Sequence, residues 1–105
     1  MHKKLPKAFD RLIVESELPV LVDFWAEWCG ACKRVTPAIE QIAREMKGRI
    51  LTVKINVDKK QYLAQRYQVT GIPTLMLFHR GQVLMRLSGA LPYEALKAEV
   101  QKRLP

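Results

Sequence analysis

The hydrophobic residues of the 105-residue chain show a helical spacing in some segments and a strand-like spacing in others, and together they predict eight helices and strands. Apolar residues three or four positions apart in a polar stretch indicate amphipathic helices, and short apolar or alternating runs indicate strands. Helices are expected over about 7–17, 29–47, 61–67 and 92–104, and strands over about 19–25, 50–57, 74–78 and 83–87. The order α-β-α-β-α-β-β-α predicts a mixed central sheet with helices on both faces.

Glycines and prolines mark the ends and irregularities of these elements. Gly48 follows the second helical pattern and is a C-terminal signal for it. Pro37 lies inside that helix and should kink it, because proline removes a backbone donor and clashes with the preceding turn. Arg80-Gly81 separates two strand patterns and predicts a hairpin. Pro92 suits the first turn of the last helix.

Composition narrows the class of protein. The length predicts one domain over residues 1–105, with hydrophobic and charged fractions (49% and 27%) that are ordinary for a soluble globular protein. The chain has no run of about 18 apolar residues, so no membrane span is expected. Its basic start lacks the apolar segment of a secretory signal, and we therefore expect a cytoplasmic protein.

The formal net charge of +8 is the one unusual bulk property. The basic residues are scattered, with the densest group at Lys3, Lys4 and Lys7, and no stretch interleaves aromatic residues with arginines as single-strand-binding surfaces do. This pattern is typical of a solvated basic surface that steers acidic partners. We expect a monomer without specific nucleic-acid binding.

The only two cysteines, Cys29 and Cys32, directly follow the first predicted strand. If Cys29 begins the helix, the two thiols are neighbours on one face, roughly 5–6 Å apart, a separation that a disulfide accepts. Free N–H groups and the helix dipole at that position favour a thiolate, the attacking form in disulfide exchange. The alternatives are buried structural thiols or half of a zinc site. A structural zinc needs four ligands, and His2 and His79 lie at no ligand spacing.

Several motifs around and beyond the cysteines, taken together, resemble thioredoxins. They are Pro19-Val20-Leu21-Val22-Asp23-Phe24-Trp25-Ala26-Glu27-Trp28-Cys29-Gly30 with Cys32-Lys33, Pro37, Val53-Lys54-Ile55-Asn56-Val57-Asp58, Gly71-Ile72-Pro73-Thr74, Phe78 with Gly81, and Ser88-Gly89-Ala90. A bare C-x-x-C is a weak signal, whereas W-C-G-x-C-K with a downstream G-I-P-T is specific. The resemblance runs from about Phe9 to the C-terminus. It implies a thioredoxin-like α/β fold, with a mixed central sheet flanked by helices on both faces.

The sequence departs from the family pattern at two places. Ala31 stands where the usual W-C-G-P-C loop has proline. Alanine restores a backbone N–H, which we expect to reach the Cys29 sulfur, stabilise its thiolate and make the couple more oxidising. Few residues precede Phe9, so the family's first strand would have to fit within about 2–5 and is expected to be short or missing.

The resemblance implies catalytic roles for two charged residues besides Cys29 and Cys32. Asp23 interrupts an apolar strand; on its own it could face solvent at an edge, but the matching thioredoxin residue is buried beneath the disulfide and moves the proton of the resolving cysteine. Burial would raise the pKa of Asp23 towards neutrality, as a base at that pH requires. Lys54 matches the lysine beside that aspartate, or is an ordinary surface lysine.

The resemblance also implies a docking site for clients. Cis peptide bonds are a minority before proline, yet the family's proline matching Pro73 is cis, and it leaves the backbone of Ile72 free to pair with an extended client segment. The client-binding residues are expected to be Trp28, Gly30, Ala31, Ile72, Pro73, Gly89 and Ala90. Trp25 and Pro37 are expected to be structural residues near the site.

By resemblance, the protein is a thiol-disulfide oxidoreductase that reduces protein disulfides. Cys29 attacks the client, Cys32 resolves the mixed disulfide, and no metal or other cofactor is needed. A thioredoxin reductase or an equivalent electron donor must regenerate the dithiol. Two alternatives stay open: a binding module or accessory subunit, which the intact C-x-x-C disfavours as the only role, and an oxidase or isomerase of secreted proteins.

Overall fold

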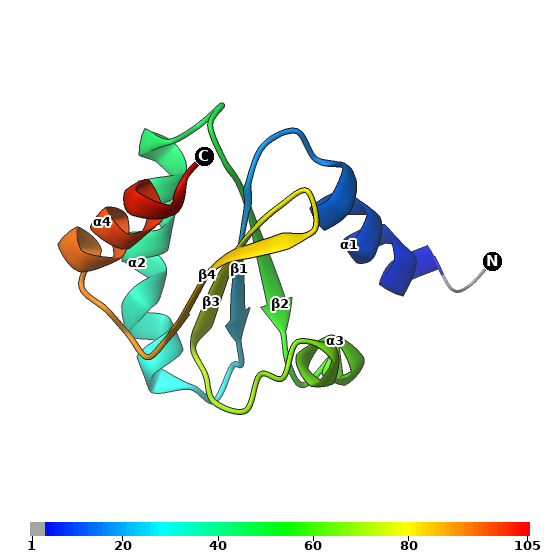
Figure 1. Ribbon diagram of the computed structural model, residues 1–105. Coiled ribbons are helices and arrows are strands. Elements are labelled where there is room, and N and C mark those ends of the chain that lie inside the picture. Colours follow the sequence, from blue (N-terminus) through cyan, green and yellow to red (C-terminus); the bar gives the residue numbers. More distant parts are fainter. Residues whose placement is uncertain (1–3) are drawn as a thin grey trace.

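A computed structural model of the protein describes the backbone of residues 4–105 and the side chains of residues 8–105. Four strands form one mixed sheet in the order β2-β1-β3-β4 (Figure 1). They are β1 (Val20–Trp25), β2 (Leu51–Asn56), β3 (Thr74–His79) and β4 (Gln82–Ser88). Strands β1 and β2 run parallel, whereas β3 is antiparallel to both of its neighbours, β1 and β4.

Four helices cover the two faces of this sheet. They are α1 (Lys4–Glu15), α2 (Gly30–Glu45), α3 (Gln61–Arg66) and α4 (Tyr93–Arg103). Helices α2 and α4 pack on one face and α1 and α3 on the other, to the left and right of the sheet in Figure 1. The architecture confirms the expected thioredoxin-like α/β fold with helices on both faces.

The pleat of the central strands explains why both layers are needed. Successive side chains of a strand point to opposite faces, so an apolar run such as that of β1 must be covered twice. Leu21 and Leu77 pack with the α2–α4 layer, whereas Val22 and Phe24 pack with the α1–α3 layer. Phe9 of α1 belongs to the second group.

Most element boundaries agree with the sequence pattern, and the differences occur at helix ends: α1 and α2 end at Glu15 and Glu45, each two residues earlier than expected, and three helices differ at their starts. Helix α1 begins at Lys4 and not near Lys7, so Lys4 and Leu5 of the possible first strand are helical, and its other residues lie outside the described part. Within residues 4–105, no strand precedes β1. The expected starts at Cys29 and Pro92 are each one residue early, because these residues cap α2 and α4 with extended backbone.

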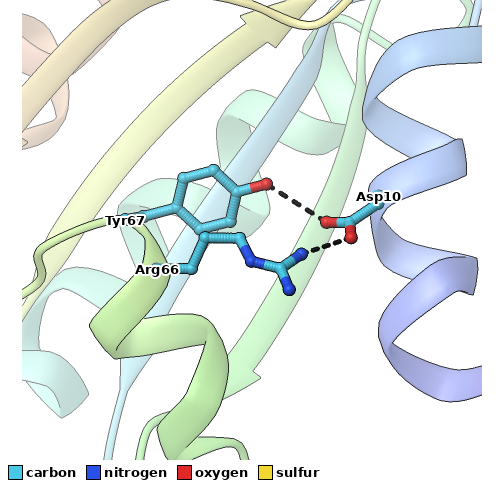
Figure 2. A network of polar contacts seen from close by, with 3 residues as sticks. All are labelled: Asp10, Arg66 and Tyr67. Carbon is cyan, nitrogen blue, oxygen red and sulfur yellow. Dashed lines mark hydrogen bonds and ion pairs between the residues drawn. The ribbon is translucent and has the colours of Figure 1, made fainter. Parts of the chain in front are cut away.

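A polar network holds α1 against the end of α3 (Figure 2). Asp10 accepts hydrogen bonds from the guanidinium of Arg66 and, at 3.3 Å, from the hydroxyl of Tyr67. Arg86 of β4 donates in turn to the carbonyl oxygen of Tyr67. The ring of Tyr67 packs edge-on against Phe9. This network joins the first helix to elements that follow it by more than fifty residues.

The packing predicts unequal costs for the same substitution at two leucines of the sheet. Leu77, which is 0% exposed, lies between the sheet and helices α2 and α4. Leu77→Ala should therefore lower the free energy of unfolding by about 2–5 kcal/mol, since it leaves a cavity. Leu51, on the edge strand β2, is 38% exposed, and Leu51→Ala should cost less than about 1 kcal/mol. Urea unfolding of the oxidised proteins measures both; equal losses would contradict this layer arrangement.

Candidate active site

Strand β1 leads directly to the two cysteines. Three residues separate Cys29 from the end of the strand, and its N–H donates to the carbonyl oxygen of Ala26 at 3.2 Å. Its backbone is extended (φ −93°, ψ 105°), so Cys29 is the N-cap of α2. A disulfide joins Cys29 to Cys32, with the two Cα atoms 5.3 Å apart. The Sγ of Cys29 also accepts a hydrogen bond from the backbone N–H of Cys32 at 3.1 Å.

The two sulfurs of this disulfide have different surroundings. Cys29 is 6% exposed and stands at the N-terminal end of α2, whereas Cys32 lies inside the first turn and is 2% exposed. The first turn of α2 contains no acidic residue. After reduction, the free N–H groups of this turn and the helix dipole therefore stabilise a thiolate at Cys29.

Asp23 is buried in the middle of β1. It is 2% exposed, and its Oδ1 has no hydrogen-bond partner among the described residues. Burial raises the pKa of Asp23 from an ordinary 3.8 to about 6, although the positive charge of Lys54 acts in the opposite direction. Lys54 is the parallel register partner of Asp23 on β2. Its Nζ lies 4.5 Å from the ring centre of Trp25, which itself packs against the cysteines.

Two further loops meet the cysteines at the same end of the sheet, the lower end in Figure 1. The peptide bond between Ile72 and Pro73 is cis, and the side chain of Ile72 packs against the cluster of Ala26, Cys29 and Cys32. The N–H of Gly89 donates to the carbonyl oxygen of Pro73 at 2.9 Å, which ties the exposed loop of Gly89 and Ala90 to the start of β3.

Trp28 is the most exposed large apolar residue of the described chain, with 71% of its surface accessible. Its indole Nε1 donates to Oδ2 of Asp58 at 2.8 Å. The side-chain oxygen of Asn56 accepts the N–H of Asp58 at 2.9 Å and so orders this turn. Sequence reasoning did not single out Asp58, although it ends the strand motif quoted above; a carboxylate directly after the strand beside β1 was the available signal.

The remaining predicted residues lie along α2. Gly30 is the exposed first residue of the helix, and Ala31 is half-buried against the cysteines. Pro37 lies within α2, exposed and outside the cysteine cluster. The expected hydrogen bond from the Ala31 N–H to the Cys29 sulfur was wrong, because the N–H of Cys32 makes that bond. An N-cap side chain reaches the second or the third helical N–H, and here it reaches the third.

Comparison with known proteins identifies this arrangement. The family model described as "Thioredoxin" matches residues 1–102. The chain is 51% identical over 100 residues to Thioredoxin 1 of Chlorobaculum tepidum (95% of this chain, 99% of that protein). It is 42% identical over 96 residues to Thioredoxin 1 of Nostoc (91% and 90%), and 38% identical over 97 residues to the chloroplastic thioredoxin M-type of spinach (92% and 54%).

The chain belongs to the thioredoxin family. It is a thiol-disulfide oxidoreductase that reduces protein disulfides through its C-x-x-C pair, and nothing in the comparisons favours a role as a binding module alone. In residues 4–105, no helix combines the length and the apolar character that crossing a membrane requires. The same part of the chain contains no group of three or more histidine, cysteine or carboxylate side chains that could bind a metal ion.

Asp23 should give this thioredoxin a characteristic pH dependence of stability. Because its pKa is raised from 3.8 to about 6, the folded protein holds the proton more tightly than the unfolded chain does. Stability should therefore fall as the pH rises from about 4 to about 6, by at most about 3 kcal/mol, and stay lower above that range. Asp23→Asn removes this decline. Urea unfolding of both oxidised proteins at about pH 4 and pH 7.5 tests the expectation; parallel stability curves would contradict it.

Ala31→Pro should make the redox potential more negative. Ala31 is the second residue of α2, so its N–H has no carbonyl four residues back within the helix and adds to the positive end beside Cys29. Proline removes that N–H and destabilises the Cys29 thiolate by about 0.3–1 kcal/mol, the usual size of a helix-dipole interaction. This energy corresponds to a shift of the redox potential by about 5–20 mV. Equilibration of both proteins with glutathione measures the shift. An unchanged or less negative potential would contradict this role of the N–H.

Proposed function

We propose that Cys29 is the attacking thiol and Cys32 the resolving thiol of this reductase. The observation that carries the assignment is the position of Cys29 as the N-cap of α2, with Cys32 deeper in the first turn. The Cys29 thiolate attacks one sulfur of a client disulfide, and the other client sulfur leaves as a thiolate. The Cys32 thiolate then attacks the Cys29 sulfur. The second client thiolate is released, and two electrons have passed from the protein to the client.

Asp23 serves in this proposal as the base that accepts the proton of the Cys32 thiol. Its burial on the strand that leads into the cysteine loop supports the role, as does a pKa of about 6, which leaves a carboxylate able to take a proton near neutrality. Lys54, the register partner of Asp23, keeps that pKa from rising further. Asp23 would gain a proton when Cys32 is deprotonated to attack the mixed disulfide, and would lose it when the protein is reduced again.

The client docks, in this proposal, on the surface around Cys29. Trp28 supplies an exposed ring that Asp58 holds in place, and the half-buried side chain of Ile72 borders the cysteines. The backbone of Ile72 pairs with an extended client segment. Small residues at the surface complete the docking site: Gly30, Ala31, Gly89 and Ala90. Pro73 is buried and contributes through its cis peptide bond, which sets the direction of the Ile72 backbone.

We further propose that the protein works as a single domain and a monomer in the cytoplasm, where protein thiols are kept reduced. A thioredoxin reductase or an equivalent electron donor regenerates the dithiol. Both the donor and the clients would approach Cys29, since Cys32 is the more deeply buried of the pair.

The two cysteines should respond differently to substitution by serine. Cys29→Ser should abolish insulin reduction driven by dithiothreitol and form no mixed disulfide with insulin. Cys32→Ser should also fail to turn over but should accumulate that mixed disulfide, because attack proceeds and resolution does not. Non-reducing gels and mass spectrometry of the reaction distinguish the two. Accumulation of the mixed disulfide by Cys29→Ser and not by Cys32→Ser would reverse the assignment.

A further inference from the structure

The guanidinium of Arg34 lies beside Gly30, the exposed first residue of α2. Arg34 and Gly30 are four residues apart and lie on one face of the helix, and long helical side chains lean towards the N-terminus. Gly30 has no side chain to occupy that space. As a result, Nη1 of Arg34 lies 3.8 Å from the point where a Cβ on Gly30 would stand. The charge of Arg34 is thus brought to the residue next to Cys29.

This guanidinium is available to a partner. Arg34 is exposed, and within the described part of the chain no carboxylate lies within 4.0 Å of it. By contrast, Arg66 and Arg103 each form an ion pair inside the protein. A guanidinium offers five donors in a planar fork that fits a carboxylate through two parallel hydrogen bonds. Arg34 therefore has unused capacity for such a group.

The docking surface has opposite charges at its two ends. At the Trp28 end, the carboxylate of Asp58 accepts the indole N–H at 2.8 Å and is thereby held at the edge of the ring. At the Gly30 end lies the guanidinium of Arg34. A client carboxylate placed at the Gly30 end meets a cation, whereas one placed at the Trp28 end meets Asp58. Charge complementarity thus favours a client with its acidic residue beside Gly30.

We propose that Arg34 is a specificity-determining residue, which selects disulfides whose cysteine is followed or preceded by a glutamate or aspartate. The inference rests on the proposed docking of clients around Cys29. The bond is an exposed, charge-assisted contact, so a preference of about threefold to fivefold over a lysine-flanked disulfide is expected at low ionic strength. The net charge of +8 also attracts acidic clients, but this general attraction acts wherever in the client the acidic residue lies. A contact with Arg34 requires that residue to lie beside the disulfide.

The test uses reduced wild-type protein and three disulfide peptides that differ only beside the cysteine, with glutamate, glutamine or lysine. Second-order rate constants for peptide reduction are measured by acid quenching and chromatography. The readout is the ratio of the glutamate to the lysine peptide, because a change in the Cys29 thiolate affects both peptides equally and cancels. Arg44→Glu is the matched control: it makes the same charge change on an exposed residue at the other end of α2, about 15 Å away along the helix.

Wild type and Arg44→Glu should prefer the glutamate peptide. Arg34→Gln should lower the ratio, Arg34→Glu should lower it further, both by more than Arg44→Glu does, and about 1 M salt should abolish the wild-type preference. An unchanged ratio in Arg34→Glu, an equal change in Arg44→Glu, or equal wild-type rates for all three peptides would overturn the role of Arg34 and leave the proposed function standing. Failure of wild type to reduce any of the peptides would overturn the proposed function, and this inference with it.

Discussion

The fold depends on the burial of strand β1 on both of its faces. Its apolar side chains pack alternately into the α2–α4 and the α1–α3 layers, and each contributes about 1.5–3 kcal/mol relative to an exposed side chain. Against this stands one carboxylate, Asp23, whose raised pKa corresponds to a cost of about 3 kcal/mol near neutral pH. One or two neighbouring side chains, such as Val22 and Phe24, are enough to offset that cost. The strand can therefore carry a buried ionisable group beneath the cysteine loop and still form the centre of the sheet.

Each loop around Cys29 is fixed by a hydrogen bond of its own. The N–H of Cys29 is bonded to Ala26, and the indole of Trp28 is bonded to Asp58. The loop of Gly89 is bonded to Pro73. Ordering a loop or a large side chain on binding costs free energy. Because these contacts already order the loops in the folded protein, binding does not have to supply that free energy. In the proposed docking mode, a client thus meets a surface that is already arranged.

The sequence predicted the elements because their signals are local: the apolar run of β1 and the helical spacing of α2 are each visible within a few turns or residues. It could not show contacts between distant residues. Trp28 and Asp58 are thirty positions apart, and no periodicity relates them. The donor to the Cys29 sulfur was assigned to Ala31 because alanine restores the N–H that proline lacks at this position; the side chain of Cys29, as the N-cap, instead accepts from the N–H of Cys32. Arg34 carried no signal either, because its closeness to the site depends on the missing side chain of Gly30.

The position of the site follows from the direction of β3. Strand β1 ends at the cysteine loop, and the parallel strand β2 ends at the same edge, where Asp58 follows it. Because β3 runs antiparallel to β1, with Phe24 opposite Thr74, it begins where β1 ends. The residues just before β3, Ile72 and Pro73, must therefore lie beside the start of α2. In an all-parallel sheet, β3 would end beside the cysteines, and Ile72 and Pro73, which precede it, would lie at the opposite end of the sheet, a strand length away. The antiparallel strand thus brings Cys29 and the backbone that we propose as the client-binding segment to one place.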